Sequence, residues 1–136
     1  MRRATALLAT AAVAIAGCGG GSSADDAKAA VQTYLNAFVD GDGAKACSLM
    51  TNSTRQQFVT RTKVLTKTTD CATAIEAIRT QAGQAAMGAL KKVKFSAVKV
   101  KGDTATVKLT SGASSSTATL KKEGGGWKVS GVPGTQ

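Results

Sequence analysis

Residues 25–42, DDAKAAVQTYLNAFVDGD, decide the fold because they predict a long amphipathic helix that the rest of the chain must cover. The large apolar side chains recur at the i, i+3, i+4 and i+7 spacing of one helix face: Val31, Tyr34, Leu35 and Phe38. Asp25 and Asp26 suit the positive end of a helix, and Gly41 suits its termination. We therefore expect a helix from Asp25 to Asp40 with its apolar stripe facing the core.

Three shorter helices are predicted after this one. Asp42 can cap a helix from Gly43 to Met50, and the cap-forming residues at 51–53 predict a third helix from near Thr54. The apolar residues of that third helix are Phe58, Val59 and Leu65. A fourth helix is expected from near Asp70, with Cys71, Ala74, Ile75 and Ile78 on one face. Glycines at 83 and 88 predict a frayed helix or loop up to Leu90.

After Lys91 the apolar period changes from 3.6 to 2, which indicates strands. A two-residue turn at Gly102-Asp103 and a bulge near Ser96-Ala97 would set Phe95 opposite Leu109. Residues 111–115 are expected to form a loop before a strand at 116–122, which turns at 124–126 into the strand 127–129. The predicted fold class is α+β, with N-terminal helices packed on a curved antiparallel sheet of about four strands.

The first 18 residues, MRRATALLATAAVAIAGC, predict export. Two arginines, an uncharged run and then small residues are typical of a secretory signal peptide, and the run is too short to span a bilayer. Ile15-Ala-Gly-Cys18 resembles the lipobox of bacterial lipoproteins, in which the cysteine is acylated, commonly with palmitate. We expect a signal peptide at 1–17, a lipidated Cys18 and flexible tether at 18–24, a domain at 25–132 and a loose tail at 133–136. The protein would lie on the extracytoplasmic face of the cell membrane.

The other two cysteines predict a disulfide. Cys47 and Cys71 form an even pair in an oxidising compartment, and a bond between them closes a loop of 24 residues. The chain contains no histidine, so neither a metal site nor a histidine-based catalytic site is expected.

Excess positive charge is concentrated in the last third of the chain. The net charge is +10, and the chain from Lys91 onward contains nine lysines but only two acidic residues. On the predicted strand phase, one outer face of the sheet would carry seven lysines: Lys92, Lys94, Lys99, Lys101, Lys108, Lys121 and Lys128. An exported protein does not ordinarily meet nucleic acid, so the relevant anions are lipid headgroups or cell-wall polymers. A solvated face is the alternative.

The order of elements, with Val31 to Asp42, Ala46-Cys47, Leu49 and Gly126-Trp-Lys-Val129, resembles the NTF2-like, or SnoaL-like, superfamily of cone-shaped folds. It is particularly similar to small actinobacterial lipoproteins of that type. The resemblance implies an apolar pocket between the first helix and the concave sheet. Ketosteroid isomerases of this superfamily place an oxyanion-stabilising tyrosine where Tyr34 stands. Their general base is a carboxylate, but a gapless extension puts Phe58 at that position, which cannot take up a proton.

These observations favour a non-catalytic binder of a small apolar ligand, with no cofactor. The candidate pocket residues are Tyr34, Phe38, Phe58, Phe95, Leu109 and Trp127. One alternative is that these residues simply fill a small core. A second is an envelope protein that binds anionic lipid or wall polymer through its lysine face, and a third is a degenerate isomerase or cyclase. The sequence does not indicate an oligomeric state.

Overall fold

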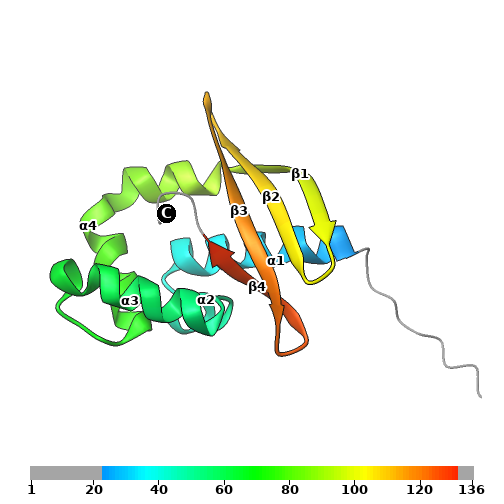
Figure 1. Ribbon diagram of the computed structural model, residues 1–136. Coiled ribbons are helices and arrows are strands. Elements are labelled where there is room, and N and C mark those ends of the chain that lie inside the picture. Colours follow the sequence, from blue (N-terminus) through cyan, green and yellow to red (C-terminus); the bar gives the residue numbers. More distant parts are fainter. Residues whose placement is uncertain (1–22, 132–136) are drawn as a thin grey trace, which may run out of the picture.

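Four helices precede four strands in the computed structural model, which describes residues 23–131 (Figure 1). The helices are α1 (Ser23–Asp40), α2 (Gly43–Ser48), α3 (Asn52–Thr66) and α4 (Cys71–Lys91). The strands are β1 (Lys94–Lys101), β2 (Thr104–Ser111), β3 (Ser114–Glu123) and β4 (Gly126–Gly131). They form one antiparallel sheet in the order β1-β2-β3-β4. The predicted α+β class, helices followed by a four-stranded antiparallel sheet, is confirmed.

The sheet lies across α1, whereas α2, α3 and the first half of α4 group beyond its end (Figure 1). Helix α1 buries one stripe of side chains, including Val31 and Tyr34, and ends at Asp40 as predicted. Gly41 has a φ of 84°, a left-handed conformation that favours glycine and stops the helix. The helix begins at Ser23, two residues before the predicted start, so the predicted tether is wrong at its last two residues.

Side-chain caps fix the starts of the other three helices. Asp42, Thr51 and Asp70 each accept a hydrogen bond from the backbone N–H three residues later, which satisfies a donor that the helix leaves unpaired. Helix α2 ends at Ser48, and Met50 instead makes an isolated bridge to Val129 of β4.

Helices α3 and α4 differ in how they pack, and one prediction about α4 is wrong. Helix α3 has no buried residue, and Leu65 is 64% exposed, because only the first half of this helix reaches the core. The Ala-rich stretch before residue 90 is helical to Lys91, with a single break at Gly83, where φ is 78° and ψ is 171°. One glycine therefore absorbs the whole bend, and helix continues beyond it.

The register of the sheet follows the predicted alternation closely. Phe95 pairs with Leu109 and Leu120 pairs with Val129. The bulge lies at Ala97-Val98, one residue later than predicted, and Ala97 has a φ of 46°. The predicted loop at 111–115 is wrong, because β2 and β3 continue to a two-residue turn between Ser111 and Ser114.

Buried side chains form two clusters on either side of the α1 stripe. One lies between α1 and the sheet, and its largest members are Val31, Val107, Leu109, Leu120 and Trp127. The other joins α1, α2, α4 and β4, and includes Tyr34, Met50, Ile75 and Val129. The predicted Cys47–Cys71 disulfide is confirmed in this second cluster, where it links α2 to α4 over a Cα–Cα distance of 6.2 Å.

Candidate functional site

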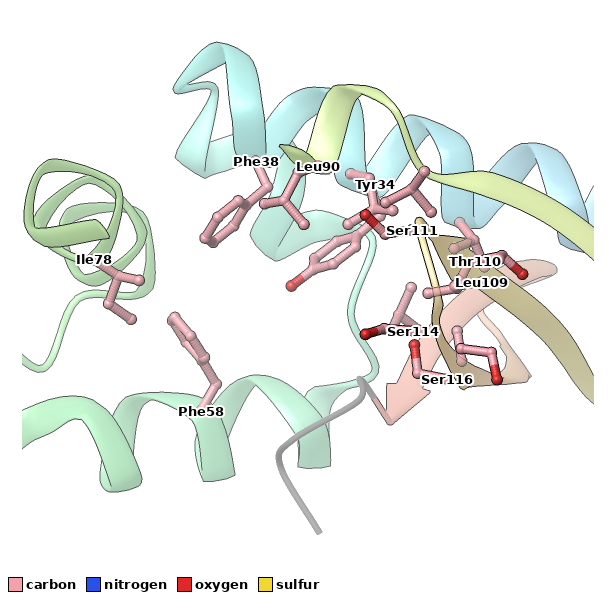
Figure 2. Close-up of a pocket in the computed structure, with 16 residues that line it drawn as sticks. Tyr34, Phe38, Phe58, Ile78, Leu90, Leu109, Thr110, Ser111, Ser114 and Ser116 are labelled. Atoms are coloured by element: carbon pink, nitrogen blue, oxygen red, sulfur yellow. The ribbon is translucent and has the colours of Figure 1, made fainter. Parts of the chain in front are cut away.

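A cavity of about 460 Å³ lies where α1, α3, α4 and the β2–β3 hairpin meet (Figure 2). This volume is within the range of about 300–1,000 Å³ that is common for small-molecule sites. Sixteen residues line it, and none of them is Lys, Arg, Asp or Glu. The cavity therefore suits an apolar molecule, or an apolar part of one.

One end of the cavity is aromatic and aliphatic. Phe38 comes from α1, Phe58 from α3, and Ile78 and Leu90 from the two halves of α4 (Figure 2). The kink at Gly83 allows α4 to contribute a side chain on each side of its bend. Because all four side chains lack polar atoms, this end can bind a ligand only by burying apolar area.

The other end carries hydroxyl groups from the β2–β3 hairpin. Ser111 pairs with Ser114 across the turn, and Ser116 pairs with Leu109 one step further along the strands. Alternation along β3 places Ser114 and Ser116 on the same face as the buried Ala118 and therefore toward α1. Figure 2 shows these serines on the side of the cavity opposite Phe58 and Ile78.

Tyr34 lies between the two ends, with its hydroxyl directed toward the open centre of the cavity (Figure 2). The side chain is 4% exposed, and burial raises its pKa to about 12, so it is a neutral hydrogen-bond donor at physiological pH. Within residues 23–131 no protein group hydrogen-bonds to this hydroxyl, yet it is not sealed inside the core. Its ring packs against Phe38, with centroids 6.4 Å apart. The hydroxyl is thus available to a molecule in the cavity.

Four of the six predicted pocket residues line this cavity: Tyr34, Phe38, Phe58 and Leu109. The other two do not. Trp127 packs in the cluster between α1 and the sheet, with the Lys122 ammonium 5.2 Å from its ring centroid. Phe95 packs at the edge of the same cluster and borders a separate surface hollow beside Lys94.

Sequence reasoning missed Leu90, Val93 and the hairpin serines as lining residues. Leu90 falls where a frayed segment was expected, so it had no predicted face. Ser111 and Ser114 fall where a loop was expected, whereas Val93 and Ser116 were assigned to strands but not to the pocket. A signal for the serines was present, since Ser114, Ser116, Ala118 and Leu120 continue one alternating inward row.

The cavity lacks the usual groups for acid–base chemistry. Phe58, which the sequence comparison sets at the position of the carboxylate base of ketosteroid isomerases, presents its ring to the cavity. Tyr34 is the sole titratable side chain among the lining residues that the structure describes. Elsewhere in residues 23–131, no three His, Cys, Asp or Glu side chains are grouped to hold a metal ion.

Most of the predicted lysines do share the outer face of the sheet. Strand pairing sets Lys101, Thr104, Lys121 and Lys128 in one row across all four strands. Lys94, Lys99 and Lys108 lie on the same face, among threonines and serines. The prediction that Lys92 lies on this face is wrong, because Lys92 forms the C-cap of α4 and precedes the sheet. Lys128 is half-buried and donates from Nζ to the Ser48 carbonyl oxygen at 2.6 Å.

The family model described as Domain of unknown function (DUF4878) matches residues 16–130. No curated protein and no solved structure matches the chain. Cys18 and the predicted signal peptide lie outside the described residues. In the part of the chain that the structure describes, every helix is too short or too polar to cross a membrane.

Proposed function

Since the chain belongs to the DUF4878 family, whose description assigns no activity, we propose its function from the cavity. The protein is a non-catalytic binder of a small apolar ligand, held at the extracytoplasmic face of the membrane by an acylated Cys18. The domain is of the NTF2-like type, and the ligand lies in the cavity where α1, α3, α4 and the β2–β3 hairpin meet. One observation carries this proposal: an uncharged cavity of about 460 Å³ into which Tyr34 directs a hydroxyl that no protein group in residues 23–131 hydrogen-bonds.

The physical basis for binding is the apolar end of the cavity. Burial of apolar surface contributes about 25 cal/mol per Å², so contact with Phe38, Phe58 and Ile78 supplies most of the affinity. Tyr34 supplies orientation, since one neutral donor in an apolar site favours a ligand that carries an acceptor. Binding without turnover follows from the lining, because no described lining residue can take up a proton at neutral pH.

The test is native mass spectrometry and a thermal-shift screen of lipids and small hydrophobes on the full chain with Cys18→Ser. Phe58→Ala, which removes part of the wall, and Ile78→Trp, which fills the cavity, should both change ligand uptake. Val64→Ala is the matched control, because Val64 is 74% exposed on α3 and does not line the cavity. Failure of every compound to raise the melting temperature would contradict the proposal.

The membrane anchor has a separate test. Wild-type protein should be labelled by a palmitate analogue and remain with the membrane fraction. Cys18→Ser should be neither labelled nor retained by that route. Labelling of the variant would contradict the acylation of Cys18.

A second candidate function is the binding of anionic lipid headgroups. It is favoured by the lysine row, which consists of Lys101, Lys121 and Lys128. Ser23, the first residue of α1, borders the same hollow as Lys122 and Gly125, so the anchored end of the domain lies beside the β3–β4 turn. Lys101 and Lys121 stand near that end, and a lysine close to an anionic membrane contributes about 1 kcal/mol. A single acyl chain anchors weakly, so a basic surface would act as a second signal.

This second function predicts that Lys101→Glu/Lys121→Glu weakens retention on vesicles containing anionic lipid by more than tenfold at low salt. Lys45→Glu/Lys63→Glu makes the same change of charge on the helices and should have a much smaller effect. Equal losses for both pairs would indicate non-specific attraction and would exclude a role for the lysine row.

A further inference from the structure

The cavity separates its apolar and polar groups into two ends, and this separation restricts the ligand further than apolarity alone. Phe38, Phe58, Ile78 and Leu90 surround one end, and the β2–β3 hairpin supplies hydroxyls at the other. Ser114 is exposed, whereas Ser111, Ser116 and the four apolar side chains are half-buried, so the most exposed of these lining residues lies at the serine end. A molecule that fills the cavity would therefore present a polar end at the hairpin.

The hairpin hydroxyls are free to bind such a polar end. Ser111, Ser114 and Ser116 have no side-chain hydrogen bond to any group in residues 23–131. Antiparallel pairing at a two-residue turn holds them on rigid strands at one face, which lowers the entropy cost of binding several ligand oxygens at once. Each hydroxyl can donate and accept, so these serines suit ligand oxygens that do both.

The same lining disfavours a charged ligand. None of the residues that border the cavity in the described chain carries a charge, so a carboxylate or phosphate drawn inside would lose water without a compensating partner. Arg61 borders a smaller hollow that shares Phe58 and Ile78 with the cavity. Arg61 is exposed on α3, and Ser111, Ser114 and Ser116 do not line that hollow.

We propose that the ligand is an uncharged lipid whose chain lies between Phe58 and Ile78 and whose hydroxyl and ester oxygens bind Ser111, Ser114 and Ser116. The class is that of a monoacylglycerol: one apolar chain, one ester and free hydroxyls. Tyr34, midway between the ends, donates to the ester carbonyl. This inference rests on the proposed function, because it requires that the cavity be a binding site.

The experiment compares three probes of similar chain length on the full chain carrying Cys18→Ser, so that the protein's own acyl chain cannot occupy the cavity. The probes are 1-monooleoylglycerol, which has the neutral headgroup, oleate, which has a charge, and 1-octadecene, which has neither. Affinity is measured by native mass spectrometry and by thermal shift, at probe concentrations below those at which each probe aggregates. The glyceride should bind roughly tenfold more tightly than the alkene, since two or more hydrogen bonds add to the same buried chain.

The variants assign that difference to named hydroxyls. Ser114→Ala/Ser116→Ala and, separately, Tyr34→Phe should each reduce the preference for the glyceride severalfold while leaving alkene affinity unchanged. Thr117→Ala is the matched control, because Thr117 lies on the same strand, is exposed and points to the outer face.

The outcomes distinguish this inference from the proposed function. Equal affinity for the glyceride and the alkene would overturn the neutral-headgroup inference but leave the cavity as an apolar site. Tighter binding of oleate, abolished by Arg61→Gln, would overturn it in favour of a carboxylate ligand. If none of the three probes binds and the wider screen also fails, the proposed function fails with it.

Discussion

The two walls of the cavity differ in how deeply their side chains are buried. One wall consists of α1 and the sheet, where Val31, Val107 and Leu120 are each at most 1% exposed. The other consists of α3 and the second half of α4, where α3 has no buried residue and Val64 is 74% exposed. The comparison shows that most buried contacts lie in the wall of α1 and the sheet, which we call the packed wall. The wall of α3 and the second half of α4, the thin wall, has few. Because few buried contacts hold α3, we expect it to open at lower free-energy cost than α1 or the sheet.

Two hydrogen bonds attach the N-terminal end of α3 to the sheet. The backbone N–H of Thr51 donates to the Val129 carbonyl at 2.9 Å, and that of Asn52 donates to a Glu123 carboxylate oxygen at 2.9 Å. These two bonds fix the start of α3 against β4 and the end of β3. Movement of α3 would therefore be a swing about its N-terminal end, with Phe58 as its main contact with the cavity.

The largest expected effect lies in the disulfide that links α2 to the first half of α4, beside the two walls. Cys47→Ser/Cys71→Ser should lower the free energy of unfolding by about 3.5 kcal/mol, because the bond closes a loop of 24 residues in the unfolded chain. Denaturant titration followed through the single tryptophan, Trp127, measures it. A loss below 1 kcal/mol would show that α2 and α4 are held together without the bond.

Truncating one leucine in each wall measures how much the two walls differ in their contribution to the free energy of unfolding. Leu120→Ala should cost about 3 kcal/mol, because a side chain that is 1% exposed leaves a cavity behind. Leu65→Ala on α3 should cost less than about 0.5 kcal/mol, since Leu65 is 64% exposed. Similar losses at both sites by chemical denaturation would remove the distinction between the walls.

The pH dependence of stability examines the buried Tyr34 in the packed wall. The unfolded chain ionises its tyrosine near pH 10, whereas burial raises the pKa of Tyr34 to about 12 in the folded protein. The unfolded state therefore loses its proton first, and stability should fall by about 2–3 kcal/mol between pH 10 and 12 while being unaffected below pH 10. Tyr34 is the only tyrosine, so tyrosinate absorbance reports it directly.

Tyr34→Phe is the control, because it subtracts every contribution to the pH dependence other than that of the Tyr34 hydroxyl. The variant should lack this part of the pH dependence. A tyrosinate transition at pH 10 in folded wild-type protein would mean that the hydroxyl is solvated and not buried.

The smallest effects concern the two glycines of α4, and they should have opposite signs. Gly83→Ala places a Cβ on a residue with a φ of 78°, which should destabilise the protein by about 1 kcal/mol and straighten the bend that positions Leu90. Gly88 is helical and has open space around it, so Gly88→Ala should stabilise by about 0.5–1 kcal/mol. Thermal unfolding of both variants checks the signs, and stabilisation by both would show that the kink is not required.

The sequence predicted the packed wall better than the thin one, for a physical reason. The α1 stripe and the strand alternation repeat over many residues, so Val31, Phe95 and Leu120 were assigned correct faces and partners. Helix α3 and the end of α4 lack such a pattern, since Thr-rich and Ala-rich stretches have weak periodicity. The faces of Leu65 and Leu90 depend on tertiary packing and on the bend at Gly83, which local sequence does not determine.

The site was only partly predictable for the same reason. Tyr34, Phe38, Phe58 and Leu109 could be assigned to the cavity from their helix or strand faces. Phe95 and Trp127 point to the inner side of the sheet, but which part of that side is filled and which is open depends on where α3 and α4 pack. Ser111 and Ser114 were missed because a five-residue loop was predicted where a tight turn brings both strands to the cavity.

The most direct test of ligand binding in the cavity is a methyl NMR titration of isoleucine-labelled protein. After residue 18 the chain contains two isoleucines: Ile78, which lines the cavity, and Ile75, which is fully buried in the neighbouring cluster. Addition of 1-monooleoylglycerol to the full chain with Cys18→Ser should shift the Ile78 methyl signal in a saturable manner and move the Ile75 signal much less. Saturation with no change at Ile78 would place the ligand elsewhere and contradict the account.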